Sequence, residues 1–257
     1  MVDCIIQARM GSTRFPKKVL QNIKPKKTIL EFLIDQLKYS KKIERIIIAT
    51  TLLDEDNEIE RMCKKIGIKC FRGDSKNVLD RYYKCAKHFE TKNIMRITSD
   101  CPLIDPELID EGIKKFDEGK FDYVENSQGQ FPHGLDYCIF RFNQLEDAWK
   151  NAKLPSEKEH VIPYILKNID QKKYFNFQSE KDYSKIRITL DYPEDLELLQ
   201  EVVLHINSEP IKFEDIITLF KKNPNLLEIN SGHKKDEGYL KSLEEDKKML
   251  EKTDVNE

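Results

Sequence analysis

The loop after the first apolar segment of this chain combines residues that suit phosphate binding. It contains a glycine, two hydroxyl side chains and several cations, and its candidate nucleotide-binding and catalytic residues are Gln7, Ala8, Arg9, Gly11, Ser12, Thr13, Arg14 and Lys18. Backbone N–H groups and positive charge around a polyphosphate are typical of nucleoside triphosphate sites. The loop lacks the pattern of a P-loop and the three glycines of a dinucleotide-binding fingerprint. Taken alone, it is equally consistent with a basic surface turn.

A second motif places a carboxylate at the end of another predicted strand. Residues 93–98 are expected to form a buried strand, and Asp100 follows it. Ligands of open α/β sheets bind at the carboxyl ends of strands, so Asp100 is a candidate ligand for a divalent cation. Asp191 also ends a predicted strand, but the proline and acidic residues after it make a helix N-cap an alternative role. Asp105, which precedes a proline, is predicted to be a structural N-cap.

Six strings of the sequence together resemble one enzyme family. In chain order they are QARMGSTRFPKKVL, FRGDSKNVLDRYY, RITSDCPLIDP, FPHGLDYCIF, EKEHVIPY and ITLDYPEDLELL. Their order and spacing resemble those of cytidylyltransferases similar to the spore-coat polysaccharide protein SpsF, relatives of the acylneuraminate and Kdo cytidylyltransferases. The likeness extends from Ile5 to about Leu199. It implies a single Rossmann-like, GT-A-like nucleotidyltransferase domain that uses CTP and Mg²⁺ and forms a homodimer.

The resemblance also implies roles for individual residues. Mg²⁺ is expected on Asp100 and Asp191, because related enzymes place the metal on one aspartate from each of these two motifs. Arg72 and Arg81 lie in a region that closes around the nucleotide in the family, where they would contact base or phosphate; stabilising the start of a helix is the alternative for Arg81. Arg96 lies within an apolar strand pattern and is therefore expected to have a carboxylate, a phosphate or a substrate as its partner.

The loop at residues 132–136, with the sequence PHGLD, resembles the loop on the acceptor side of the site in this family. Asp136 in this loop is the stronger candidate for acceptor binding or a second metal contact. His133 lies beside a glycine and is more often a turn residue than a general base in such a position. Glu159 and His160 resemble a helix that supports the site or a dimer contact, and a structural role for His160 is the alternative.

The reaction implied by this resemblance is the transfer of CMP from CTP to a small anionic acceptor, such as an acid sugar, for surface glycan biosynthesis. Arg9, Arg14 and Lys18 are expected to stabilise the departing pyrophosphate and, with Asp100, to form the catalytic set. Such chemistry depends on positioning and charge neutralisation, so no catalytic role is expected for Cys101. The alternatives are a nucleotide-sugar pyrophosphorylase that acts on a sugar 1-phosphate, and a non-catalytic nucleotide-binding protein of a glycan pathway.

Composition narrows the class of protein and its partners. The chain has 257 residues, 35% of them charged, and a formal net charge of −2, so no basic field indicates a nucleic-acid partner. No stretch approaches the about 18 apolar residues of a membrane span, and we expect a cytoplasmic protein without a membrane partner. The six cysteines show no C-x-x-C spacing and are expected to be reduced core residues.

The elements that must position these residues alternate between strand and helix patterns. This rhythm predicts an α/β fold with a mixed, mostly parallel sheet. Strands are expected at Cys4–Ala8, Arg45–Thr50, Lys69–Arg72, Ile94–Thr98, Phe121–Glu125, Leu135–Phe140, Tyr174–Gln178 and Ile186–Leu190. Residues 1–230 are predicted to form the nucleotidyltransferase domain. Residues 231–257 are strongly polar and are predicted to be an exposed C-terminal tail, helical at most in part and without function.

Overall fold

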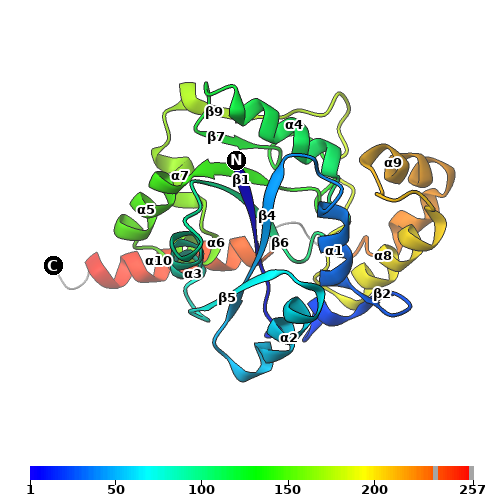
Figure 1. Cartoon of the computed structure of the whole chain (residues 1–257), viewed down its shortest axis with the longest axis horizontal. Helices are drawn as coiled ribbons and strands as arrows, with labels where there is room; N and C mark the ends of the chain where they lie inside the picture. Colours follow the sequence, from blue (N-terminus) through cyan, green and yellow to red (C-terminus); the bar gives the residue numbers. More distant parts are fainter. Residues whose placement is uncertain (234–236, 255–257) are drawn as a thin grey trace.

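A computed structural model shows a seven-stranded mixed sheet with helices on both faces (Figure 1). The structure describes residues 1–233 and 237–254. The strand order is β5-β4-β1-β6-β8-β7-β9. The first four of these are parallel to one another and span Lys69–Gly73 (β5), Ile43–Thr51 (β4), Val2–Gln7 (β1) and Asn93–Thr98 (β6). The predicted α/β fold with a mixed, mostly parallel sheet is confirmed.

One antiparallel strand joins this parallel core to the rest of the sheet. β8 (Cys138–Arg141) runs antiparallel both to β6 and to β7 (Tyr123–Glu125), and β9 (Tyr174–Asn176) pairs in parallel with β7. Gln7 at the end of β1 is in register with Thr98 at the end of β6. The loop after β1 and the segment after β6 therefore emerge next to each other at one edge of the sheet.

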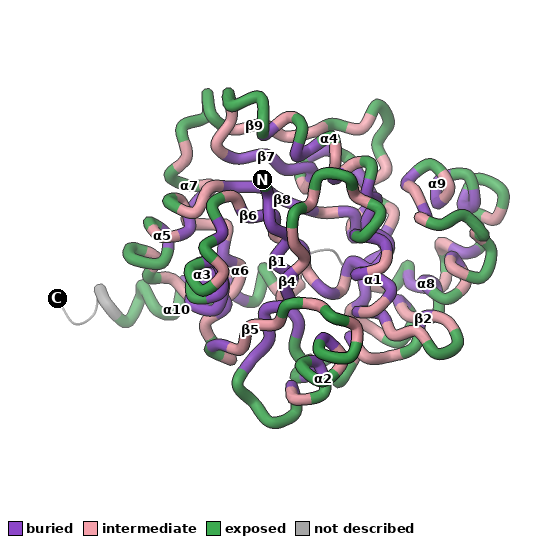
Figure 2. The backbone as a smooth tube through the Cα atoms, in the orientation of Figure 1, coloured by how far each residue is buried: buried purple, intermediate pink, exposed green. Residues whose placement is uncertain are grey.

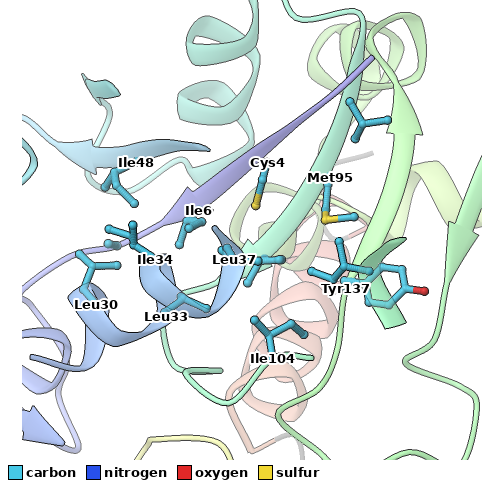
Figure 3. Packing of buried hydrophobic residues seen from close by; sticks show 14 of the residues in the cluster. Cys4, Ile6, Leu30, Leu33, Ile34, Leu37, Ile48, Met95, Ile104 and Tyr137 are labelled. Carbon is cyan, nitrogen blue, oxygen red and sulfur yellow. The ribbon is translucent and has the colours of Figure 1, made fainter. Parts of the chain in front are cut away.

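Two helix layers enclose the sheet because alternate strand residues point to opposite faces. One layer holds α1 (Ile29–Leu37), α2 (Asn57–Ile66) and α4 (Pro106–Asp117); the other holds α3 (Val78–His88), α5 (Phe142–Asn151) and α7 (Pro163–Asn168). Along β1, Cys4 and Ile6 pack on the first layer and Ile5 on the second. Figure 3 shows the apolar face of α1 directed at these β1 side chains. Burial is therefore greatest along the central strands, and Figure 2 shows exposed outer helix faces.

Two additional elements pack against the outer side of α1. α8 (Pro193–His205) and α9 (Phe213–Lys222) share an apolar cluster with residues of α1. A short hairpin of β2 (Asn22–Lys24) and β3 (Lys27–Thr28), which the sequence patterns do not predict, lies before α1. None of the helices among residues 1–233 and 237–254 is long and apolar enough to cross a membrane.

The helical pattern that the sequence shows over Lys158–Lys167 corresponds to two helices in the structure. α6 (Pro155–His160) ends where Val161 adopts a positive φ of 70°, and α7 begins two residues later. The strand expected at Ile186–Leu190 is also wrong. That segment makes only an isolated bridge, between Arg187 and His133, although the Leu190 N–H donates to the Asp100 carbonyl at 2.8 Å. The hydrogen bond between Leu190 and Asp100 still brings Asp191 beside the end of β6.

The C-terminal segment differs from the exposed tail that its composition predicts. Glu237–Asp254 form an 18-residue helix, α10, that packs along α6. Its side chains Ser242 and Asp246 are buried, and Asp246 accepts a hydrogen bond from the Ser156 N–H at 2.9 Å. The run of Lys and Glu indicates a solvated end, but the buried Ser242 and Asp246, one turn apart, hold the helix against α6.

A buried carboxylate holds the segment around Asp191 in place. Asp195 in α8 is fully buried and accepts hydrogen bonds from the Asp191 and Tyr192 N–H groups at 2.8 and 3.0 Å. Its two oxygens also accept from the Arg187 guanidinium at 2.8 Å each, and Asn230 donates to it at 2.8 Å. Burial would raise the pKa of Asp195, but Arg187 and these donors lower it overall, so the carboxylate stays ionised.

Replacing Asp195 with Asn should therefore destabilise the fold strongly. The variant removes the buried carboxylate that accepts two hydrogen bonds from Arg187 and leaves the guanidinium only its longer contact to Asp191, at 3.2 Å. Breaking a buried pair of this kind typically costs about 3 kcal/mol or more. We expect a loss of that size in the free energy of unfolding, measured by urea denaturation. Glu194→Gln is the matched control, because this neighbouring carboxylate is exposed and should change stability by less than about 0.5 kcal/mol. Equal effects of the two variants would contradict this role for Asp195.

Candidate active site

The loop after β1 is held open by hydrogen bonds to its own backbone and to a buried carboxylate. The Met10 N–H donates to Asp56 Oδ1 at 2.7 Å, and the Met10 carbonyl accepts from the Ser12 and Lys17 N–H groups at 2.9 Å each. Lys17 has a left-handed backbone conformation, with φ of 59°, which turns the chain into the 3-10 helix Lys18–Leu20. No acceptor in the described part of the chain meets the N–H groups of Gly11 and Thr13. These groups are free to bind an anion.

Lys18 lies at the centre of the site. Its ammonium group donates to Asp100 at 3.1 Å, to Asp191 at 2.9 Å and to the Leu190 carbonyl at 2.6 Å. Burial opposes the charge, but the two carboxylates outweigh it and raise the pKa of Lys18. The same contacts lower the pKa of Asp100 and Asp191 despite the burial of both. All three groups are therefore charged at neutral pH.

Arg14 adds a second cation to this cluster. Its guanidinium contacts Asp191 Oδ1 at 2.6 Å and lies over the ring of Tyr192, 5.4 Å from the ring centroid. The side chain of Arg14 remains about one-third exposed, at 33%, whereas that of Lys18 is 11% exposed. Asp191 thus holds a buried ammonium and a more accessible guanidinium at once. The accessible one is the better placed to turn toward a ligand.

Most of the predicted nucleotide-site residues line a single open cavity of about 610 Å³. Its walls come from the loop after β1, the ends of β1 and β6, the start of α3, and the segment at Asp191. The predicted residues in these walls are Gln7, Ala8, Arg9, Gly11, Ser12, Thr13, Arg14, Lys18, Arg81, Arg96, Asp100 and Asp191. A smaller cavity, of about 390 Å³ beside α1, contains none of them. The structure therefore brings the two motifs together.

Arg72 does not reach this cavity. Its guanidinium donates to Glu60 at 2.8 Å, to Asn57, and to the carbonyls of Thr51 and Leu53 at 2.9 Å each. These contacts tie β5 to the start of α2. The geometry indicates a structural residue whose donors are already committed.

The predicted acceptor-side residues also lie outside the cavity walls. The His133 N–H and carbonyl bond to the backbone of Ile186 and Ile188, and His133 Nδ1 lies 3.5 Å from Arg187. Asp136 accepts from the Gly134 N–H at 2.9 Å. Both residues therefore belong to the turn before β8, which packs against the segment that leads to Asp191.

Two arginines, Arg81, which is buried, and Arg96, which is partly buried, line the cavity without a carboxylate partner in the described chain. Arg81 is 1% exposed and donates to the Asp74 carbonyl, and Arg96 donates to Gln7 Oε1 at 3.1 Å and lies over the Tyr82 ring. The Nε atoms of both arginines are buried and unpaired in the described structure. Burial lowers the pKa of Arg81. A buried, incompletely paired cation is costly, so this wall is suited to an anionic or hydrogen-bonding ligand.

Two helices far from the other wall residues in sequence also reach the cavity, and the sequence patterns indicate a role at the site for only one of them, α6. Arg9 contacts Glu159 of α6 at 3.1 Å, which brings α6 to the cavity together with Pro155, Lys158 and His160. α10 adds Gly238, Lys241, Ser242 and Glu245. The contact of Arg9 with Glu159 joins residues 150 positions apart, and no sequence pattern places α10 at the cavity. Cys101, by contrast, is buried and its thiol pKa is raised by burial, which agrees with a non-catalytic residue.

The two carboxylates fit the donor set of Mg²⁺. Asp100 and Asp191 share one ammonium partner and lie in the wall of the same cavity. No group of three or more His, Cys, Asp or Glu side chains in the described residues could form a complete protein cage for a metal. Mg²⁺ commonly binds through one or two carboxylates together with substrate phosphates and water, so a pair is sufficient.

Comparisons with known proteins agree with this geometry. Residues 4–235 match the family model described as cytidylyltransferase. An uncharacterized protein of Methanocaldococcus jannaschii is 42% identical over 88% of this chain and 93% of its own length. The spore coat polysaccharide biosynthesis protein SpsF of Bacillus subtilis is 32% identical over 86% of this chain and 94% of its own length.

A solved structure shows the same arrangement of the backbone. The cytidylyltransferase from Leptospira borgpetersenii superposes with a TM-score of 0.83 at 36% identity, over 88% of this chain and 96% of that one. The cavity, its cations and its paired carboxylates lie within the matched region, apart from the contribution of α10. The chain belongs to the cytidylyltransferase family and is a cytidylyltransferase.

Proposed function

We propose that this enzyme transfers CMP from CTP to a small anionic acceptor of surface glycan biosynthesis and releases pyrophosphate. The observation that carries the proposal is the cluster of Lys18, Asp100 and Asp191 in the wall of one cavity. The name of the Bacillus subtilis relative, a spore coat polysaccharide biosynthesis protein, supports a glycan precursor as the product.

CTP would lie across the loop after β1. The unpaired N–H groups of Gly11 and Thr13 are suited to phosphate oxygens, and Arg14 and Lys18 lie on the same side of the cavity. An acceptor oxygen attacks the α-phosphorus in line, the bond to the bridging oxygen breaks, and pyrophosphate leaves. The acceptor hydroxyl gives its proton to water. Arg9, Arg14 and Lys18 balance the charge that develops on the leaving group, which is where a fixed cation accelerates the reaction.

Asp100 and Asp191 are the residues that would hold Mg²⁺, and the ion would supply polarisation of the phosphate oxygens. The depressed pKa values of the two carboxylates keep them ionised and therefore available as ligands. Lys18, which bonds to both in the present structure, can exchange these contacts for phosphate oxygens because its long side chain ends at the cavity surface.

The class of acceptor follows from the arginines of the cavity wall that are not assigned to the triphosphate. Arg81 and Arg96 lie in the cavity wall with unpaired Nε atoms, whereas Arg72 is committed elsewhere. Two guanidinium groups beyond those at the triphosphate loop favour an acceptor with a carboxylate or a phosphate. A sugar 1-phosphate would also satisfy them, and pyrophosphate release assayed with acid sugars and with sugar phosphates distinguishes the two acceptors.

Asp100→Asn should abolish turnover and leave the fold nearly intact. The amide can still accept a hydrogen bond from Lys18, but it no longer carries the charge that a metal ligand requires. We expect Mg²⁺-dependent pyrophosphate release to fall by about 10²-fold or more, with a circular dichroism spectrum like that of the wild type. Asp35→Asn, on the outer side of α1, removes a charge outside the nucleotide cavity and serves as the control. Turnover within a few-fold of wild type would remove Asp100 from the metal site.

The enzyme should prefer CTP over ATP, GTP and UTP. A compact site at the carboxyl ends of parallel strands can recognise a pyrimidine through backbone groups of the loop 7–14, whereas a purine needs more room and different donors. Isothermal titration of each nucleotide in the presence of Ca²⁺ gives the four affinities without turnover. Tighter binding of GTP or UTP than of CTP would favour a nucleotide-sugar pyrophosphorylase instead.

A further inference from the structure

Helix α10 lies beyond the region that matches the family and yet forms part of the nucleotide cavity. The family match ends at residue 235, and α10 begins at Glu237. Gly238, Lys241, Ser242 and Glu245 line the cavity that contains Arg14, Lys18 and Asp100. These four residues recur at spacings of three and four, which places them on one face of a helix. The cavity therefore has a wall that the family pattern does not supply.

This wall is fixed to the domain at two turns of the helix. Ser242 is buried and its hydroxyl lies 3.0 Å from His160 Nε2 of α6. The buried Asp246 accepts from the Ser156 N–H in the first turn of α6, and the Tyr239 ring meets the His160 ring edge-on at 5.1 Å. A carboxylate that satisfies N–H groups at the start of another helix is a capping interaction supplied from a distance. α10 is thus docked by specific polar contacts.

The start of α10 is also connected to the residues around Asp191. Glu237 accepts a hydrogen bond from the hydroxyl of Tyr192, the residue whose ring lies under Arg14. A Cβ atom added to Gly238 would lie only 3.9 Å from a guanidinium nitrogen of Arg14, so the helix backbone passes close to the triphosphate loop. Lys241 is one turn further along the same face. Its side chain therefore starts near the cations proposed to bind phosphate.

The ammonium group of Lys241 meets no partner among residues 1–233 and 237–254. It is exposed, and it makes no ion pair or side-chain hydrogen bond within the described residues. Across the described cavity wall, eight Lys and Arg side chains face four carboxylates. A nucleoside triphosphate would neutralise this excess of positive charge.

We propose that α10 is a functional wall of the nucleotide site in which Lys241 binds the phosphates of CTP. The inference rests on the placement of CTP proposed above. Glu245, one turn beyond Lys241, lines the same cavity and would repel the phosphates, whereas Glu237 at the Arg14 end is hydrogen-bonded to Tyr192 and lies outside the cavity wall. The phosphates are therefore placed toward the Arg14 end of the helix. The polar C-terminal segment then completes the binding site for CTP.

The affinity of CTP in the presence of Ca²⁺, measured by isothermal titration on full-length variants, tests the proposal. Lys241→Gln should weaken CTP binding by about tenfold, because charge-assisted contacts to phosphate contribute about 1.5 kcal/mol or more. Lys247→Gln is the matched control: it removes the same charge from the same helix at an exposed position outside the cavity wall. Equal affinities of these two variants would overturn the role of Lys241.

Two further variants separate this inference from the proposed placement of CTP. Lys18→Gln and the more exposed Arg9→Gln should each weaken CTP binding if the triphosphate lies on the loop after β1. Normal affinity in both would overturn that placement and the inference with it. Weakened binding in both, with Lys241→Gln unchanged, would overturn the inference alone. Hydrogen exchange gives an independent readout: CTP should increase the protection of amides in 238–246, and unchanged protection would contradict a wall that contacts the nucleotide.

Discussion

The ammonium group of Lys18 joins three segments that lie far apart in the sequence. It bonds to Asp100 after β6 and to Leu190 and Asp191 before α8, while its own backbone ends the loop after β1. Two carboxylates that converge on one site repel each other unless a cation lies between them. Arg14 and Arg187 contact Asp191, but Lys18 is the cation that contacts both carboxylates, so the position of Asp100 relative to Asp191 depends on it. Under the proposed function, the same charges would bind Mg²⁺ and the triphosphate.

Hydrogen bonds to two buried carboxylates hold the backbone segments that carry Lys18 and Asp191. Asp195 holds the backbone of Asp191 and Tyr192 and is itself paired with Arg187. On the other side of the loop, the buried carboxylate of Asp56 accepts from the Met10 N–H. Buried carboxylates of this kind must be hydrogen-bonded to be tolerated, so they constrain the geometry around them. The candidate site residues can remain partly exposed because the carboxylates that hold them, Asp56 and Asp195, are fully buried.

The part of the site that follows from strand ends could be predicted from the sequence. Gln7 ends β1 and Asp100 follows β6, and the carboxyl ends of neighbouring strands converge in any sheet of this class. Asp191 does not follow a strand, and the hydrogen bond from the Leu190 N–H to the Asp100 carbonyl brings it to the same place. Asp105 could be predicted as an N-cap for a similar local reason, and its side chain accepts from the Glu107 N–H at 2.7 Å. These positions depend on local chain geometry together with one rule of topology.

The rest of the site depends on contacts that no local pattern encodes. The sequence indicates a ligand-binding role for Arg72, but its guanidinium donates to Asn57 and Glu60 of α2 instead. The polar composition of α10 indicates a solvated segment, because Ser242 and Asp246, the buried residues in the described part of the helix, are themselves polar. Such errors arise where a few non-local hydrogen bonds outweigh composition.

A double-mutant cycle on Lys18 and Asp191 tests the central claim most directly. The free energies of unfolding of wild type, Lys18→Met, Asp191→Asn and the double variant are measured by urea denaturation. If the Lys18 ammonium holds the site together, the two substitutions will be non-additive, with a coupling free energy of about 1 kcal/mol or more. Additive effects would contradict the account, because they would mean that the loop after β1 and the segment before α8 hold their positions independently.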